Sequence, residues 1–196
     1  MLTLYGTTTS PYVRRVRVVA TELGLPHELV NTASPDGQSR LHAVTPIWKV
    51  PVAELNGRVV LDSRVIVDEL MRRYGPGPLR PHDDALEASN LLTVIDGALD
   101  SLINAFYLAK DGLGRDSASY LERQHRRARS ALEWIEARLG GPELGGELGL
   151  LGIALVCALD WMQFREAYSV ADHPSLAAFL ASHADRPSFV ATHPRV

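Results

Sequence analysis

The chain has 196 residues, of which 46% are hydrophobic and 22% are charged, and its formal net charge is −3. A chain of this length and composition folds as one large or two small globular domains without disulfide or metal staples. The small negative charge gives no overall attraction to nucleic acid or to an anionic membrane, so neither partner is expected. The longest apolar run, residues 148–159, is shorter than the roughly 18 residues that span a bilayer and predicts a buried helix.

Two further features bear on the cellular compartment. Met1 leads directly into a strand pattern, without the charged and apolar regions of an export signal. The single cysteine, Cys157, lies inside the apolar run and excludes an internal disulfide bond. We therefore expect a cytoplasmic protein.

The N-terminal segment predicts a strand, a helix and a second strand. Residues 2–5 and residues 27–30 have the composition and alternation of short strands. Between them, Ser10 suits the N-cap of a helix and Pro11 suits its first position, because proline lacks a backbone donor. An apolar stripe follows at helical spacing, and Gly24 supplies the left-handed residue that ends a helix.

The next segment predicts a loop and then a hairpin. Residues 32–48 are interrupted by prolines and a glycine, so we expect a loop with room for a short helix. Residues 50–55 and 58–61 are β-branched runs separated by Asn56 and Gly57, the strongest short signal for a two-residue hairpin. These two strands should therefore be antiparallel.

Helical patterns make up the rest of the chain. Asp62 and Ser63 suit the cap of a helix that ends at Gly75. The segment GPGPLRP, residues 75–81, can continue neither a helix nor a strand and is interpreted as a linker. Four further helices are predicted, at residues 86–108, 117–139, 148–168 and 175–183. The sequence thus predicts an α/β domain followed by an all-α helical bundle domain.

The start of the first helix is the candidate active site. Three threonines and Ser10 surround a helix N-terminus, which carries unpaired amides and a partial positive charge. A hydroxyl-lined helix N-terminus suits an anion or a thiolate.

Other charged residues indicate no additional site. Arg14, Arg15 and Arg17, and the basic run at residues 123–129, are expected to be solvated helix faces. The seven histidines are scattered without the spacing of metal ligands, so no metal site is expected.

The order of these elements, together with five segments, resembles the cytosolic glutathione transferase superfamily over the whole chain. The segments are TSPYVRRVR, TPIWKVPVAEL, VLDSRVIVDEL, IALVCALDWMQFR and HPSLAAFLASHADRPSFVATHP. The resemblance implies a thioredoxin-like, glutathione-binding domain over residues 1–76, a linker over 77–85 and an all-helical domain over 86–196. It also implies a pocket for a second substrate, lined by the helical domain, and a two-fold homodimer.

The resemblance implies that a hydroxyl at the first turn activates the thiol of glutathione. A thiol with a pKa of about 8.5 is mostly protonated at neutral pH, and lowering that pKa by about two units requires roughly 2.7 kcal/mol. A hydroxyl hydrogen bond and a helix N-terminus together can supply this energy. Ser10 lies where both act, Thr9 is the nearest rival donor and Tyr5 the next.

Four further residues are expected to hold the tripeptide. The resemblance implies a cis peptide between Val50 and Pro51, which presents the backbone of Val50 for strand-like pairing. Lys49 could meet the glycyl carboxylate, or simply face solvent. Asp62 and Ser63 offer an acid, a hydroxyl and backbone donors to a γ-glutamyl head group, although a pair that only caps its helix would look the same.

The predicted function is a glutathione transferase acting on small hydrophobic electrophiles, without a metal. The cysteine pair of thioredoxins and glutaredoxins is absent from the first turn, which excludes dithiol exchange by this chain alone. A glutathione-dependent isomerase and a non-catalytic scaffold of the same fold stay as alternatives. Candidates for lining the electrophile pocket are Tyr12, Trp48, Phe106 and Tyr107.

One departure from the family concerns the long buried helix. Relatives usually begin it with a serine or threonine cap and an aspartate three residues later, where this chain has Gly149 and Gly152. Either Glu147 replaces the missing cap or the helix begins differently.

Overall fold

The structure is a computed structural model that describes residues 1–194, apart from the side chain of Arg115. The chain forms two compact units. The first comprises Met1–Arg80 together with the residues from Ala184 onward, and the second comprises Pro81–His183. A small mixed sheet with helices forms the first unit and helices form the second, which confirms the predicted fold class.

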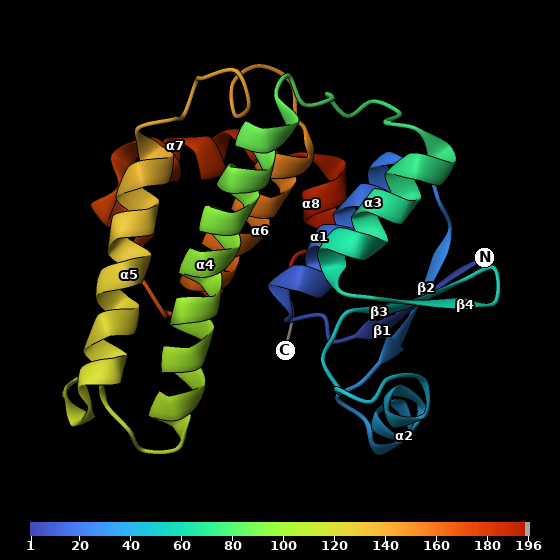
Figure 1. Cartoon of the computed structure of the whole chain (residues 1–196), viewed down its shortest axis with the longest axis horizontal. Coiled ribbons are helices and arrows are strands. Elements are labelled where there is room, and N and C mark those ends of the chain that lie inside the picture. Colours follow the sequence, from blue (N-terminus) through green and yellow to red (C-terminus); the bar gives the residue numbers. More distant parts are fainter. Residues whose placement is uncertain (195–196) are drawn as a thin grey trace. The chain divides into compact units, whose positions relative to one another are not determined.

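The sheet of the first unit has four strands in the order β2-β1-β3-β4 (Figure 1). They are β1 (Leu2–Gly6), β2 (His27–Asn31), β3 (Val52–Leu55) and β4 (Arg58–Leu61). β2 runs parallel to β1, whereas β3 runs antiparallel to both β1 and β4. The carboxyl ends of β1, β2 and β4 therefore lie at the same edge of the sheet as the amino end of β3.

The two faces of the sheet are covered by different helices (Figure 1). The helices α1 (Pro11–Glu22) and α3 (Ser63–Tyr74) pack against each other on one face, and α2 (Pro35–Val44) lies on the other. The predicted apolar stripe of α1 is fully buried at Val13 and Val16, because this helix packs on the sheet and on α3.

The predicted turns are confirmed by the backbone. Asn56 and Gly57 both have positive φ, 52° and 77°, as the tight β3–β4 hairpin requires. Gly24 and Gly75, predicted to end helices, have φ of 64° and 74°. The predicted loop at residues 32–48 contains α2, whose N-cap Ser34 accepts a hydrogen bond from the Gly37 amide.

The second unit consists of α-helices and two short 3₁₀ segments, η1 and η2. They are α4 (Ala85–Lys110), η1 (Arg115–Ser117), α5 (Ser119–Glu136), α6 (Leu150–Phe164), η2 (Val170–Asp172) and α7 (Pro174–His183). α4 packs on α5 and α6, and α7 packs on α6. By length and composition α4 could cross a membrane, but apolar residues along it are buried within the unit, as in the core helix of a helical domain.

Gly149 occupies the N-cap position of α6, and no side-chain hydrogen bond caps this helix. Glu147 therefore does not replace the missing cap. Gly152, in the first turn, lies close to two apolar side chains. A Cβ atom there would lie 2.9 Å from Leu148 Cδ1 and 3.7 Å from the ring of Phe179 in α7. The departure from the family pattern therefore gives α6 an uncapped start within a tightly packed core.

The chain returns to the first unit after α7, which differs from the predicted helical domain over residues 86–196. The short helix α8 (Pro187–Ala191) packs on α1. Arg14 donates from Nη2 to the carbonyl oxygen of Phe189 at 3.2 Å, and Glu22 accepts two hydrogen bonds from Arg186 at 2.7 Å and one from Ser188. These polar contacts bring α8 into the N-terminal unit.

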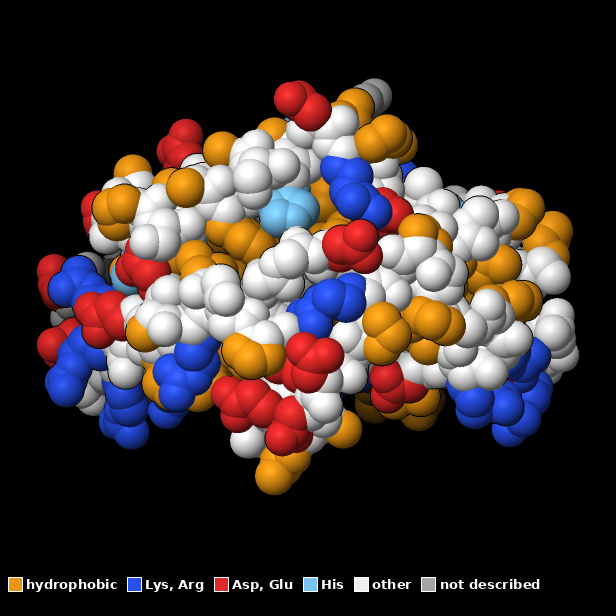
Figure 2. Space-filling model, turned by 90° about the horizontal axis from the view of Figure 1, so that it is seen from above, with side chains coloured by type: hydrophobic (Ala, Val, Ile, Leu, Met, Phe, Trp, Pro, Cys, Tyr) orange, Lys and Arg blue, Asp and Glu red, His pale blue; other side chains and the backbone are white. Residues whose placement is uncertain are grey.

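The expectation that Arg14 and Arg15 form a solvated face is wrong. Both side chains are buried, with 2% and 3% exposure, because α1 is covered by the sheet, α3 and α8. Elsewhere charge is mixed: Figure 2 shows acidic and basic side chains interspersed over the face that it presents.

Candidate functional site

The sheet topology brings the predicted glutathione-binding segments to one edge. β1 ends at Gly6 and β4 at Leu61, and β3 begins at Val52 at this same edge. The register pairs Val52 with Tyr5 on one side and with Leu61 on the other. The segments that follow β1, precede β3 and follow β4 therefore leave the sheet side by side.

Ser10 lies at this edge as the N-cap of α1. Its backbone is extended, with φ −79° and ψ 124°, and its Oγ accepts a hydrogen bond from the Val13 amide at 3.3 Å. The hydroxyl uses a lone pair in this cap, so its hydrogen can be donated to another acceptor. The side chain is half-buried, so part of it is exposed to solvent.

The two rival donors are used differently. Thr9 Oγ1 lies 3.4 Å from Thr7 Oγ1, so these two hydroxyls interact with each other. Tyr5 is buried among residues that face α2, and its hydroxyl donates to Glu54 Oε2 at 3.1 Å. Burial, and then the hydrogen bond to Glu54, raise the pKa of Tyr5. The Tyr5 hydroxyl thus serves the β1–β3 pairing and not the edge where Ser10 lies.

The segment before β3 contains a cis peptide bond between Val50 and Pro51, as predicted. Val50 packs partly against the buried cluster around Tyr5, and Lys49 is exposed. Trp48 has a positive φ of 51° and stacks on His42 of α2, with ring centroids 4.6 Å apart.

Asp62 and Ser63 form the start of α3 and have separate environments. Asp62 is exposed, and its Oδ1 accepts from the Arg64 amide at 2.8 Å, which caps the helix. Ser63 is buried, and its Oγ accepts from Arg15 Nη1 at 3.3 Å.

Arg15 is the residue of this region that sequence reasoning missed. It lies one turn into α1, 5.4 Å from the centroid of the Tyr12 ring, and reaches Ser63 at the start of α3. A buried guanidinium needs hydrogen-bond partners, so this contact ties the two helix N-termini together. Nothing in the local sequence distinguishes Arg15 from Arg17, because only the packing of α3 buries one of them.

The aromatic candidates for an electrophile pocket fall in both units. Tyr12 and Trp48 belong to the first unit, where they contact Arg15 and His42. In the second unit, Phe106 packs edge-to-face on Trp161 with centroids 5.7 Å apart, and the exposed Tyr107 lies against Phe106. Phe106 is therefore part of the packing between α4 and α6.

The described residues include no group of side chains that could bind a metal ion. Over residues 1–194, no three histidine, cysteine, aspartate or glutamate side chains gather in a way that could hold a metal ion.

Family comparison covers both units. Residues 4–78 match the model described as glutathione S-transferase, N-terminal domain, and residues 118–182 match the corresponding C-terminal domain. The uncharacterized GST-like protein YibF of Escherichia coli (strain K12) is 25% identical over 197 residues, which cover 97% of this chain and 98% of YibF.

Two similar solved structures contain glutathione or a close analogue. A glutathione S-transferase of Methylobacterium radiotolerans, in complex with glutathione sulfonate, is 32% identical and has a TM-score of 0.83, covering 100% of this chain and 95% of that one. A glutathione transferase family member of Pseudomonas fluorescens Pf-5, with bound glutathione, is also 32% identical. Its TM-score is 0.81, and the match covers 100% of both chains.

Proposed function

Because the chain belongs to the cytosolic glutathione transferase superfamily, we propose that it activates the thiol of glutathione for attack on small hydrophobic electrophiles. The thiol loses its proton, and the thiolate sulfur forms a bond to the electrophilic carbon while the bonding pair leaves with the displaced group. A cytoplasmic location and a role in detoxification are part of this proposal.

Ser10 is the proposed donor to the thiolate. The observation that carries this assignment is its geometry, because the Oγ accepts from the Val13 amide and leaves the hydroxyl hydrogen for the sulfur. The partial positive charge of the α1 N-terminus acts on the same sulfur. Both effects favour the charged form of the thiol, so both lower its pKa.

The tripeptide is proposed to bind along the sheet edge. The backbone of Val50 pairs with the cysteinyl backbone, and the exposed Lys49 meets the glycyl carboxylate. Asp62 accepts from the ammonium of the γ-glutamyl group, and Ser63 with the first amides of α3 receives its carboxylate. Arg15 supports this end of the site, because it fixes the Ser63 hydroxyl.

Replacing Ser10 tests the proposal. Ser10→Ala removes one hydrogen bond to a charged sulfur, worth about 1.5 to 3 kcal/mol, so the pKa of bound glutathione should rise by about one to two pH units. Affinity for glutathione should change only a few-fold, because the tripeptide is held elsewhere. Activity should fall most near neutral pH and recover partly at high pH. The thiolate absorbance of the bound complex, measured against pH, reports the pKa directly.

Thr9→Ala is the matched control. If that variant shifts the titration and Ser10→Ala does not, the donor is Thr9. If neither variant shifts it, backbone amides activate the thiol and the assignment of Ser10 is wrong. A calorimetric titration in which the unmodified protein fails to bind glutathione would instead favour a non-catalytic scaffold.

A further inference from the structure

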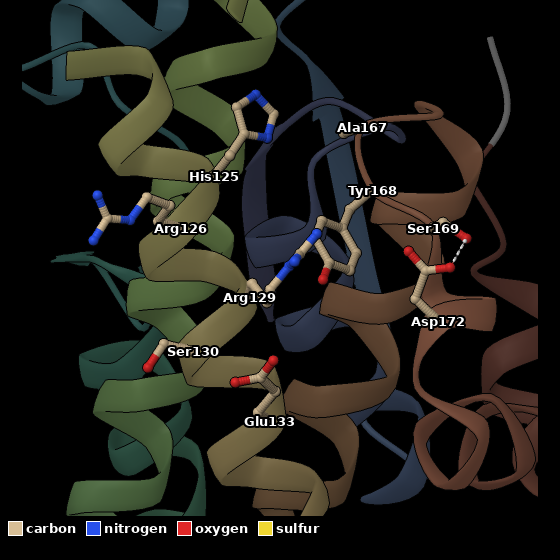
Figure 3. Close-up of a pocket in the computed structure, with 9 residues that line it drawn as sticks. All are labelled: His125, Arg126, Arg129, Ser130, Glu133, Ala167, Tyr168, Ser169 and Asp172. Atoms are coloured by element: carbon tan, nitrogen blue, oxygen red, sulfur yellow. Dashed lines mark hydrogen bonds between the residues drawn. The ribbon is translucent and has the colours of Figure 1, made fainter. Parts of the chain in front are cut away.

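The helical unit contains a cavity whose lining residues are remote in sequence from the proposed glutathione site. It has a volume of about 480 Å³ and lies between α5 and the segment that joins α6 to η2 (Figure 3). α5 contributes His125, Arg129 and Glu133 to its lining, and the opposite wall includes Tyr168 and Asp172. The mechanism proposed above uses none of these residues.

Side chains of both charges line this cavity. His125, Arg129 and Glu133 follow each other at intervals of four residues, so they lie on one face of α5 with a rise of about 6 Å between neighbours. Figure 3 shows Arg129 reaching toward Tyr168, with Glu133 one turn further along the helix. Asp172 faces α5 from the opposite wall and accepts from Ser169 Oγ at 3.3 Å. The cavity is therefore lined by side chains of both charges, with Arg129 between His125 and Glu133 on α5 and Asp172 on the opposite wall.

Tyr168 is held in place by a chain of hydrogen bonds. Its hydroxyl lies 3.0 Å from Nε2 of the buried His173, and His173 Nδ1 lies 3.0 Å from Glu136 Oε2. Glu136 Oε1 also accepts from the Ser175 amide at 2.8 Å. Burial opposes ionisation of Glu136, but the bonds from His173 and Ser175 together hold its pKa below the ordinary value.

The two ring nitrogens of His173 thus link the Tyr168 hydroxyl to the Glu136 carboxylate, which holds the Tyr168 side chain in place. Burial raises the pKa of Tyr168, which keeps the phenol protonated. Figure 3 shows the Arg129 guanidinium beside the Tyr168 side chain, so the aromatic ring and the cation line the same part of the cavity.

We propose that this cavity binds a free α-amino acid. The carboxylate would pair with Arg129, the ammonium would pair with Glu133 one turn away, and the side chain would rest on the Tyr168 ring. A simple anion beside Arg129 would also lie near acidic side chains, and a simple cation beside Glu133 would also lie near Arg129. A zwitterion pairs with side chains of both charges, whereas a ligand of one charge leaves a like charge beside it, which destabilises binding.

The test is an NMR titration of the ¹⁵N-labelled full chain with L-phenylalanine, L-leucine and L-glutamate at millimolar concentration. At least one should saturably shift the amide signals of residues 125–133 and 167–172 and the Nε–Hε signal of Arg129. Arg129→Gln and Glu133→Gln should each weaken that binding about tenfold, because each removes a charge-assisted hydrogen bond. The control Arg123→Gln, an exposed change on the same helix outside the cavity, should leave it unchanged.

The N-acetyl and the amide derivatives of the amino acids that bind separate the two charges. Each derivative lacks one charge and should bind about tenfold more weakly than its parent. Equal binding of the N-acetyl derivative would show a simple anion site and overturn the proposal. So would the absence of saturable shifts with all three amino acids, or unchanged binding in Arg129→Gln.

Discussion

Asp62 has two separable tasks at the start of α3. Its carboxylate caps the helix by accepting from the Arg64 amide at 2.8 Å, and in the proposed site it also meets an ammonium group. Its φ of 73° lies in the left-handed region, which asparagine also tolerates. Asparagine can therefore keep the cap and the backbone while removing the charge.

Asp62→Asn should weaken glutathione binding by about tenfold while the free energy of unfolding changes little, because a cap oxygen is retained and a charged partner is lost. The rate at saturating glutathione should change much less than KM, since the γ-glutamyl head is remote from the sulfur. Calorimetry and steady-state kinetics measure these effects. Asp68→Asn, an exposed change on the same helix, is the control. Equal loss of kcat with unchanged affinity would contradict the binding role.

At the scale of elements, two glycines allow a helix to pack closely against a strand end in the first unit. α2 approaches β2 at Gly37, where a Cβ atom would lie 2.0 Å from the backbone oxygen of Asn31. α1 approaches the end of β1 at Gly6, where a Cβ atom would lie 2.3 Å from Val13 Cγ2. The backbone contact at Gly37 cannot be relieved by a side-chain rotation, so α2 itself would have to move.

Gly37→Ala should therefore destabilise the protein by about 1–3 kcal/mol, the usual cost of overpacking. Gly97→Ala is a matched control in α4, because its Cβ would meet nothing within 4 Å. Gly97→Ala should raise the free energy of unfolding by about 0.5–1 kcal/mol, because alanine has a higher helix propensity than glycine. Chemical unfolding of the two variants measures both values, and a Gly37→Ala variant as stable as the parent would refute the close packing of α2.

α8 is attached to α1 by a partly buried ion pair. Glu22 is 9% exposed and Arg186 is 34% exposed, and both oxygens of Glu22 accept from Arg186 at 2.7 Å. The Arg186 hydrogen bonds, with a contribution from Ser188 and against the effect of burial, hold the pKa of Glu22 below its usual 4.5. A carboxyl with a depressed pKa stabilises the fold above the unfolded-state pKa and loses that effect as the pH falls through the folded-state value.

Glu22→Gln should accordingly lower the free energy of unfolding by about 1.5 to 3 kcal/mol at neutral pH, where the carboxylate is charged. The difference from the parent should shrink below pH 4.5 as Glu22 itself becomes protonated. Denaturant unfolding at neutral pH and at about pH 3 measures this change. The exposed Glu28→Gln should show no comparable pH dependence. A Glu22→Gln penalty that is the same at both pH values would exclude the ion pair as its source.

At the scale of the whole molecule, the proposed transferase is expected to be a symmetric homodimer, as the superfamily implies. Light scattering at micromolar concentration should give about twice the mass of the 21.5 kDa chain. The exposed apolar side chains of Ile47 and Trp48, 59% and 61% exposed, are candidates for burial in that interface. A monomer at this concentration would contradict the expectation, and Trp48→Ala with an unchanged dimer would remove this residue from the interface.

The sequence by itself determined the features that depend on neighbouring residues. Ser10 and Asp62 cap helices because their side chains reach amides two or three residues away. Asn56 and Gly57 form the hairpin turn because they tolerate positive φ. These local effects, with the apolar stripe of α1 and the helical patterns after residue 85, predicted the fold class and most of the element order, but not α8.

Only the tertiary structure decided what depends on segments far apart in the chain. Arg15 is buried, unlike its neighbour Arg17, because α3 packs over it. Ser63, at the start of α3, is 48 residues away in the sequence and contacts Arg15. The Tyr5 hydroxyl is occupied by Glu54 of a paired strand. The Tyr168 cavity likewise exists only because α5 meets the turn after α6. Side-chain burial and pairing depend on the distances between elements, and a local pattern carries no information about those distances.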